Sequence, residues 1–297
     1  MEHTDWLNER FEEHRSHLRA VAYRMLGSLS DADDAVQDAW VRFSRADTSD
    51  VDNLQAWLTT VVARVSLNML RTRQTRREES FSPHMPDPII DRPDGTDPEH
   101  QALLADSVGV ALLVVLDTLS PPERLAFVLH DIFAVPFDEI APIVDRTPEA
   151  ARQLASRARR RVQGERTAPD TDIERQRTVV DAFMAAARDG DFDALLAVLD
   201  PDVVLRADEG ALAASGGGTR EVRGALAVAR RARAFSTRGL LVQPALVNGV
   251  VGSVSFAPDG TPFAVGAFTV RGDKIVAFDI LADPERLAHL DLTVLEG

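Results

Sequence analysis

The sequence predicts a multidomain protein in which two all-α modules precede an α+β domain with a curved antiparallel sheet. The 297 residues exceed the roughly 100 to 200 residues of one average domain. Helical periodicity dominates up to about residue 163, and strong turn signals between apolar runs follow near the end of the chain. Hydrophobic residues make up 45% and charged residues 27%, which is ordinary for a globular protein.

Two segments rich in proline or glycine divide the chain. Residues 78–98 hold five prolines without a sustained period, so we expect an exposed linker of partly extended backbone. A shorter break follows between the second and third blocks. The expected division is 1–77, 78–98 (linker), 99–163, 164–172 (linker) and 173–297.

The first block is predicted to be helical throughout. The periodicity gives helices over 5–27, 31–46 and 53–76, and Ser30 is a candidate N-cap of the second. The third helix is apolar nearly all round, which indicates a central, buried element. We therefore expect Trp57 in the core rather than as a platform for a nucleic-acid base.

The third block changes from helices to strands. Helices are expected over 173–189 and near 192–199. Turn signals then separate short apolar runs, and Asn248-Gly249 is a strong hairpin signal. The expected antiparallel meander has strands at 239–247, 250–257, 262–270 and 274–281.

Residues 137–162, FDEIAPIVDRTPEAARQLASRARRRV, predict a helix, a tight turn and a second helix. Pro136 suits a first helical turn, Asp145 tolerates a left-handed conformation, and Thr147 can cap the second helix. At 100° per residue, alanines fall on one side of the second helix and Arg, Gln and Ser on the other. This pattern predicts a helix that reads a major groove; the alternative is an amphipathic bundle helix with an arginine-rich solvent face.

Charge and composition restrict the remaining classes. The net charge is −14, so the arginines near residues 71–77 and 152–161 are local features of an acidic chain. With no cysteine, neither disulfides nor thiolate metal sites can form. We expect no cofactor and no metal. We also expect a cytosolic protein, because no apolar run approaches membrane length and the acidic start lacks a basic signal-peptide region.

Four segments of the sequence resemble one family. Residues 137–162 closely resemble the σ4 helix-turn-helix of extracytoplasmic-function (ECF) sigma factors of the sigma-70 family. AYRMLGSLSDADDAVQDAWVRF (22–43) and NLQAWLTTVVARVSLNMLRTRQTRRE (53–78) are similar to the σ2 segments for polymerase docking and for the minus-10 element. The third block resembles the SnoaL-like, nuclear-transport-factor-2-like domain of the SigJ-like group.

The resemblance implies a sigma factor that directs RNA polymerase core to promoters and assists their opening. Its partners would be promoter DNA and the β′ clamp and β flap of the polymerase. The second helix of the helix-turn-helix would enter the major groove of the minus-35 element. The residues implied for minus-35 contacts are Thr147, Glu149, Arg152, Gln153, Ser156, Arg157, Arg159 and Arg160.

The σ2 resemblance implies two further surfaces. A loop over 47–53 would capture an unstacked minus-10 base, and arginines of the following helix would hold the separated strand. The residues implied for the minus-10 element are Asp50, Asp52, Asn53, Arg64, Asn68, Arg71, Arg73 and Arg76. The residues at the acidic start of the second helix would contact the β′ clamp, and the charges of the aspartates would also interact favourably with the helix dipole. These residues are Asp31, Asp33, Asp34, Gln37 and Asp38.

The SigJ-like group carries three motifs that this sequence matches with changes. Trp-Leu-Pro-Glu-Pro corresponds to residues 84–88, Asp-Gly-Gly-Gly-Lys to 208–220 with an insertion, and Asn-Pro-Asp-Lys-Leu to 282–287. The implied role is regulation of the first two blocks by the third, with a small ligand in the cone as one option. The residues implied are Pro86, Pro88, Asp208, Gly216, Gly217, Gly218 and Pro284.

Two other functions are weighed against this one. A SnoaL-type enzyme or ligand-binding protein could use Asp208, Glu209 or Asp279 as a general base, but no acid/base pair at recognisable spacing supports catalysis, and we expect no enzyme. A one-component regulator would bind duplex operators without polymerase.

Overall fold

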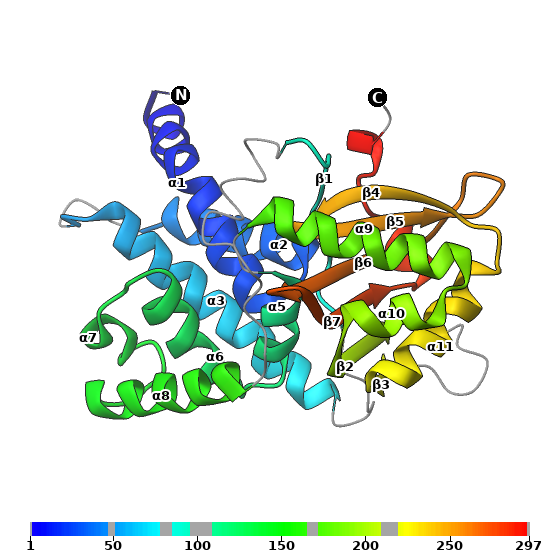
Figure 1. Ribbon diagram of the computed structural model, residues 1–297. Helices are drawn as coiled ribbons and strands as arrows, with labels where there is room; N and C mark the ends of the chain where they lie inside the picture. The colour runs from blue at the N-terminus through cyan, green and yellow to red at the C-terminus, as the bar shows by residue number, and fades with distance from the viewer. Residues whose placement is uncertain are drawn as a thin grey trace. The chain divides into compact units, whose positions relative to one another are not determined.

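The computed structural model describes residues 2–46, 51–77, 85–95, 109–164, 172–208 and 219–295, and the chain forms two compact units (Figure 1). Unit 1 comprises Met1–Phe81, Pro98–Asp106 and Val115–Gly164. Unit 2 comprises Ser82–Asp97, Ser107–Val114 and Glu165–Gly297. The segment between the two helical modules is therefore shared between both units.

Three helices form the first part of unit 1: α1 (Glu2–Leu26), α2 (Leu29–Phe43) and α3 (Leu54–Arg77). They pack against one another around fully buried side chains such as Leu18, Val36 and Leu58, which confirms the all-helical prediction. The predicted cap was wrong. Helix α2 begins two residues earlier than expected, so its N-cap is Ser28, whose Oγ accepts from the Asp31 N–H at 3.4 Å, rather than Ser30.

The second part of unit 1 is also helical. Helix α5 (Val110–Asp117) starts among the residues of unit 2 and ends in unit 1, and α6 (Pro121–Phe127) continues into a π-helical turn, η1 (Val128–Ile132). Helices α7 (Phe137–Ile140) and α8 (Pro148–Gly164) follow. Arg124 of α6 joins this part to α1, because its Nε and Nη2 each donate to the Arg24 carbonyl at 3.3 Å.

Unit 2 contains a seven-stranded sheet with the order β1-β4-β5-β6-β7-β2-β3. The predicted meander over β4 to β7 is confirmed as consecutive antiparallel pairs, whereas β2 lies parallel to β7, so the sheet as a whole is mixed. Asn248 and Gly249 both have positive φ, as a tight hairpin turn requires. The strands are β1 (Ile90–Asp91), β2 (Leu199–Asp208), β3 (Thr219–Arg223), β4 (Leu241–Val247), β5 (Val250–Phe256), β6 (Pro262–Arg271) and β7 (Lys274–Leu281).

Helices α9 (Ile173–Asp189), α10 (Phe192–Val198) and α11 (Ala225–Ser236) cover one face of the sheet (Figure 1). Three aromatic side chains fill the space beneath them. The rings of Phe268 and Phe278 stack with centroids 4.1 Å apart, and Phe183 meets Phe268 edge-on at 5.5 Å. Only a glycine fits at position 266, since an added Cβ would lie 2.7 Å from the Phe278 ring. The helix-covered face is thus a packed aromatic core.

A second core cluster of unit 2 includes Val254, Leu281, Leu287 and Leu295. Leu287 ends the short helix α12 (Pro284–Leu287), and Leu295 ends the 3-10 helix η3 (Thr293–Leu295). The residues after the last strand therefore fold back as part of unit 2.

Residues 85–91 of the first linker are mostly buried, contrary to expectation, whereas Arg92, Asp94 and Gly95 are exposed. Met85, Ile89 and Ile90 are buried, and Ile90 and Asp91 form β1 at the edge of the sheet beside β4. The Ile89 N–H donates to Asn248 Oδ1 at 3.0 Å, and the Asn248 N–H donates to the Ile89 carbonyl at 2.8 Å. The extended backbone that proline favours also suits an added edge strand, so the composition alone did not separate a free linker from a docked one.

Candidate nucleic-acid interface

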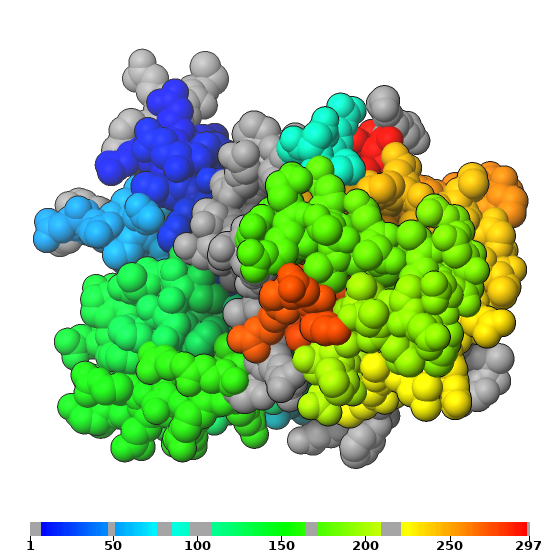
Figure 2. Space-filling view, viewed as in Figure 1, coloured from blue at the N-terminus to red at the C-terminus, as the bar shows by residue number. Residues whose placement is uncertain are grey.

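Helix α8 packs closely through small side chains. Ala151, Ala155 and Ala158 are completely buried, and α8 contacts α6. The opposite face is open: Arg152, Gln153, Arg157 and Arg160 are exposed and Ser156 is half-buried. Helix α8 lies along the surface of unit 1 in the face shown by Figure 2. The alanines therefore hold the helix close to its support while its polar face stays accessible.

The turn before α8 has the predicted chemistry. Asp145 has φ of 55°, and Thr147 Oγ1 accepts from the Ala150 N–H at 3.3 Å as an N-cap. Hydrogen bonds from its own main-chain N–H and from the Thr147 hydroxyl lower the pKa of Glu149, with a smaller effect of Arg152. Helix α7 ends at Ile140, so Pro142 follows the helix and removes no hydrogen bond from its interior.

Arg152 and Arg159 of α8 each contact an earlier helical segment. The Arg152 guanidinium lies 5.2 Å from the centre of the Phe137 ring, a cation–π contact between the two helices of the motif. The Arg159 Nε donates to Asp131 Oδ1 at 2.8 Å. Arg159 thus ties α8 to η1, which sequence periodicity did not indicate because Asp131 lies 28 residues earlier.

Three side chains line up along α3. Arg64, Asn68 and Arg71 are exposed, and their spacing of four and three residues puts them on one helical face. Arg73 differs, because its Nη1 donates to the Leu26 carbonyl at 2.9 Å and its guanidinium pairs with Asp31. The family resemblance assigned all four residues to the minus-10 element. In the structure Arg73 is engaged within unit 1, whereas the other three are exposed.

The residues before α3 are only partly described. Asn53 Oδ1 accepts from the Ala56 N–H at 3.0 Å and so caps the helix, and Asp52 is exposed. Asp50 and the side chain of Arg76 lie outside the described residues. Trp57 is half-buried with its ring 6.1 Å from that of Phe43, a core-edge position close to the one expected.

The acidic start of α2 divides into paired and outward residues. Asp33 Oδ1 accepts from the Arg19 Nε at 2.7 Å, and Asp31 pairs with Arg73. The side chains that point outward are Asp34, Gln37 and Asp38, which are all exposed.

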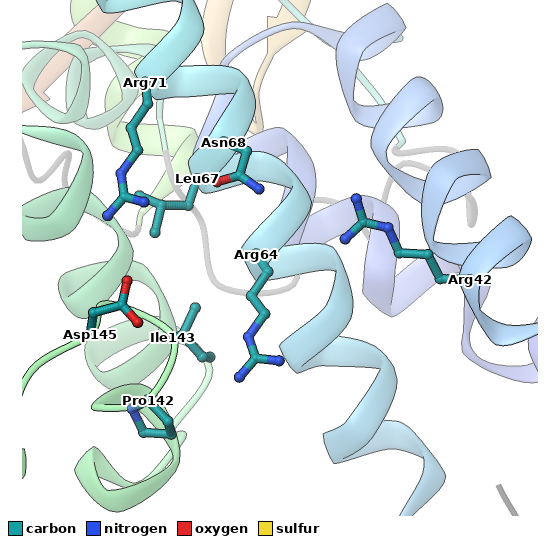
Figure 3. Close-up of a pocket in the computed structure, with 8 residues that line it drawn as sticks. All are labelled: Arg42, Arg64, Leu67, Asn68, Arg71, Pro142, Ile143 and Asp145. Carbon is teal, nitrogen blue, oxygen red and sulfur yellow. The ribbon is translucent and has the colours of Figure 1, made fainter. Parts of the chain in front are cut away.

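A pocket lies within unit 1 where α2 and α3 face the helix-turn-helix (Figure 3). Its volume is about 270 Å³. One wall carries Arg42 of α2 with the Arg64, Asn68 and Arg71 face, over Leu67; the other carries Pro142, Ile143 and Asp145. Sequence reasoning missed Arg42, because no local pattern brings residue 42 next to residue 143.

Asp208, one of the predicted regulatory residues, meets residues of the first linker around Arg286. The Met85 N–H donates to Asp208 Oδ2 at 3.2 Å, and Arg286 donates from Nη1 to the same oxygen at 3.0 Å and from Nη2 to the Met85 carbonyl at 2.6 Å. Asp87 also pairs with Arg286. Pro86 and Pro88 are buried beside this group, and Pro284 opens α12. Gly216, Gly217, Gly218 and Glu209 lie outside the described residues.

Asp279 is fully buried on β7. Arg206 Nη1 donates to the Asp279 Oδ1 at 2.8 Å, while the Asp279 Oδ2 has no hydrogen-bond partner among the residues that the structure describes. Burial raises the pKa of Asp279, and Arg206 opposes this effect. Over the described residues no group of three or more His, Asp or Glu side chains could hold a metal ion.

Two helical modules, one ending in a helix-turn-helix with an open polar face, define a DNA-binding protein. The family models agree: Sigma-70 region 2 matches residues 10–76, and Sigma-70 region 4 matches residues 109–162. The chain is 39% identical to the ECF RNA polymerase sigma factor SigJ of Mycobacterium tuberculosis over 93% of this chain and 91% of that protein. The probable ECF RNA polymerase sigma factor SigI of the same species is 38% identical, over 68% and 70%.

The crystal structure of M. tuberculosis SigJ is also similar. It covers 96% of this chain and 99% of its own, with 36% identity and a TM-score of 0.75. The chain belongs to the ECF sigma factors of RNA polymerase, and its similarity to SigJ includes the C-terminal α+β domain. Its function is to direct RNA polymerase core to promoters, which makes it a transcription regulator. None of the described helices is long and apolar enough to span a membrane.

Proposed function

We propose that α8 reads the minus-35 element of the promoters this sigma factor serves. The observation that carries this proposal is the open polar face of α8 above a completely buried alanine face. Side chains of Arg, Gln and Ser can pair with base edges and phosphates in a major groove. Arg159 acts here as a support for α8 through Asp131. The contacting residues proposed are Thr147, Glu149, Arg152, Gln153, Ser156, Arg157 and Arg160.

The exposed face of α3 is assigned to the opened minus-10 strand. Arg64 and Arg71 would bind phosphates, and Asn68 lies between them. Asp50, Asp52 and Asn53 are assigned to base capture by the family pattern, and Arg76 to the strand backbone. Arg73 keeps a minus-10 role only indirectly, since it holds α3 against the start of α2.

The polymerase surface is assigned to the start of α2. Asp34, Gln37 and Asp38 point outward and could meet basic residues of the β′ clamp. Asp31 and Asp33 stabilise the bundle through their arginine partners. The β flap would bind the second helical module.

Unit 2 is assigned a regulatory role through the linker. The support is the set of bonds from Asp208, Asn248 and Arg286 to residues 85–91. The packed aromatic interior and the engaged carboxylates favour regulation over catalysis or a ligand in the cone. We retain 1–77, 99–163 and 173–297 as the functional divisions, with 78–98 and 164–172 as linkers.

The test is promoter opening with purified core polymerase. The full chain should associate with core and open a promoter fragment, as detected by permanganate reactivity of unpaired thymines. A chain ending at Gly164, which lacks the domain that binds the linker, should open promoters to a different extent. Unchanged opening at every promoter would remove the regulatory role. Binding to duplex sites without core would favour a one-component regulator.

A further inference from the structure

The pocket between α2, α3 and the helix-turn-helix concentrates positive charge in an acidic protein. Arg42, Arg64 and Arg71 line it, and the only acidic side chain among its lining residues is Asp145. All three arginines are exposed, and none forms an ion pair with another described residue. Figure 3 shows Arg42 on α2 and Arg64 and Arg71 on α3, all facing the space beside α3. Unpaired guanidinium groups gathered in a concave site, in a chain of net charge −14, indicate an anionic ligand.

The other lining residues narrow the class of anion. Guanidinium forks match phosphate oxygens, and the Asn68 amide can both donate to and accept from the edge of a base. Leu67 and Ile143 are buried side chains that give the pocket an apolar floor. A volume of about 270 Å³ lies just below the usual range for ligand pockets, about 300 to 1,000 Å³, which suits a small ligand.

We propose that this pocket binds a nucleoside monophosphate, with its phosphate at the wall that carries the arginines and its base beside Asn68 and Ile143. Both walls are needed for the pocket, so the ligand binds only while α3 faces the helix-turn-helix. Binding of the ligand to this pocket requires no contact with a promoter. The effect of the ligand on transcription rests on the proposed minus-10 role of Arg64 and Arg71.

The effect of the ligand on promoter binding follows from the length of a promoter. Elements centred near minus 35 and minus 10 are about 25 base pairs apart, or about 85 Å along B-DNA at about 3.4 Å per step. Two modules that line one small pocket cannot reach both elements together. A ligand specific for the packed arrangement therefore stabilises a form that cannot hold the whole promoter, and it covers the α3 face at the same time.

Calorimetric titration of the full chain with adenosine monophosphate tests the site. Adenosine, which lacks the phosphate, should bind at least tenfold more weakly. Arg42→Gln should weaken binding of the monophosphate about tenfold, and Asp145→Asn, which keeps a residue that tolerates positive φ, should strengthen it about threefold. Arg45→Gln, an exposed position near the end of the same helix but outside the pocket, should have no effect. Equal affinities for nucleotide and nucleoside, or equal effects of the two arginine variants, would overturn the proposal.

The distance between α1 and α8 tests whether the ligand keeps the two helical modules packed. The chain has no cysteine, so Glu13→Cys and Gln163→Cys give two unique dye positions on α1 and α8. Adenosine monophosphate should keep energy transfer high after core polymerase and promoter are added, and Arg42→Gln should abolish that effect. No effect of the nucleotide on transfer would overturn the consequence. Transcription without nucleotide is measured separately, so a failure of the sigma-factor assignments remains distinguishable from a failure of this site.

Discussion

The guanidinium of Arg286 lies 3.0 Å from the carboxylate of Asp208, which joins α12 to the end of β2. Both side chains are nearly buried, with 14% and 9% of their surface exposed. The same arginine donates to the Met85 carbonyl, so the pair also holds the segment that links the two helical modules. This ion pair therefore contributes to the attachment of the linker to unit 2, together with the pairing of β1 with β4 and the hydrogen bonds between Ile89 and Asn248.

Replacing Arg286 by Met should loosen the attachment of the linker. The change removes the arginine partner of the buried Asp208 carboxylate, which costs about 3 kcal/mol. Amide hydrogen exchange of residues 85–91 should become about 100-fold faster, since each tenfold corresponds to about 1.4 kcal/mol. Arg188→Met, at a position with 77% of the side chain exposed, is the matched control. Equal exchange in both variants would show that the ion pair does not hold the linker.

Replacing Gln153 by Ala should weaken recognition of the minus-35 element without unfolding α8. The side chain is exposed, so thermal stability should change little. Loss of one good base contact costs about 1 to 3 kcal/mol of discrimination. The affinity of the polymerase holoenzyme for its promoter, measured against a fragment with a scrambled minus-35 element, should lose selectivity about tenfold. Selectivity equal to that of the unaltered chain would place base reading elsewhere.

Asp131→Asn separates support from DNA contact on α8. It removes the charge that holds Arg159, so it should loosen the attachment of α8 to η1 while leaving every proposed base-reading side chain in place. We expect a loss of at most about 1 kcal/mol, because the pair is partly exposed. The measurement is amide exchange along α8 together with promoter selectivity. Lost selectivity with unchanged exchange would instead mean that Asp131 itself takes part in reading DNA.

Acid should destabilise unit 1 through His17. Its Nε2 lies 3.1 Å from Thr59 Oγ1, and the Thr59 hydroxyl donates to the Gln55 carbonyl, so the oxygen accepts from a neutral His17 that carries its proton on Nε2. Burial, with smaller contributions from His14 and Arg24, lowers the pKa of His17 below 6.5. Because the folded pKa is the lower one, this stabilisation is complete above about pH 6.5 and is lost as pH falls through the lowered value.

The measurement for His17 uses tryptophan fluorescence, since Trp6, Trp40 and Trp57 all belong to unit 1. The stability of the natural chain relative to His17→Gln should rise between pH 5 and pH 7.5. A difference that does not vary with pH would contradict the assignment.

Asp279 should show the opposite dependence in unit 2. Burial raises the pKa of its carboxyl group, so the folded state holds the proton more tightly than the unfolded state. Stability relative to Asp279→Asn should therefore fall as pH rises from about 3.9 through the raised pKa. Amide exchange of β5 to β7 measures this, with Asp273→Asn in an exposed turn as control. A relative stability that rises with pH would contradict the burial effect.

Local sequence patterns predicted the elements whose structure depends on residues close together in the sequence. The alanine face of α8, the positive φ at Asp145 and the Asn248-Gly249 hairpin follow from spacing and residue type, and the structure confirms them. The expected helices over 173–189 and 192–199 also agree with α9 and α10.

Contacts between distant segments could not be predicted in the same way. Strand β1 forms only because β4 offers an edge more than 150 residues later, and the parallel pairing of β2 with β7 depends on the whole order of strands. Arg73 and Arg159 have the same residue type as their neighbours, but acidic partners at Asp31 and Asp131 turn them inward. Such partners are fixed by the tertiary fold, which periodicity does not reveal.

Strand opening in the presence of core polymerase tests most directly whether α3 binds the opened minus-10 strand. A complex of the full chain with core should make thymines of the minus-10 region reactive to permanganate, and Arg64→Ala combined with Arg71→Ala should reduce that reactivity while core binding is retained. A complex that leaves the minus-10 region paired, or equal opening by the double variant, would contradict the assignment of α3 to the opened strand.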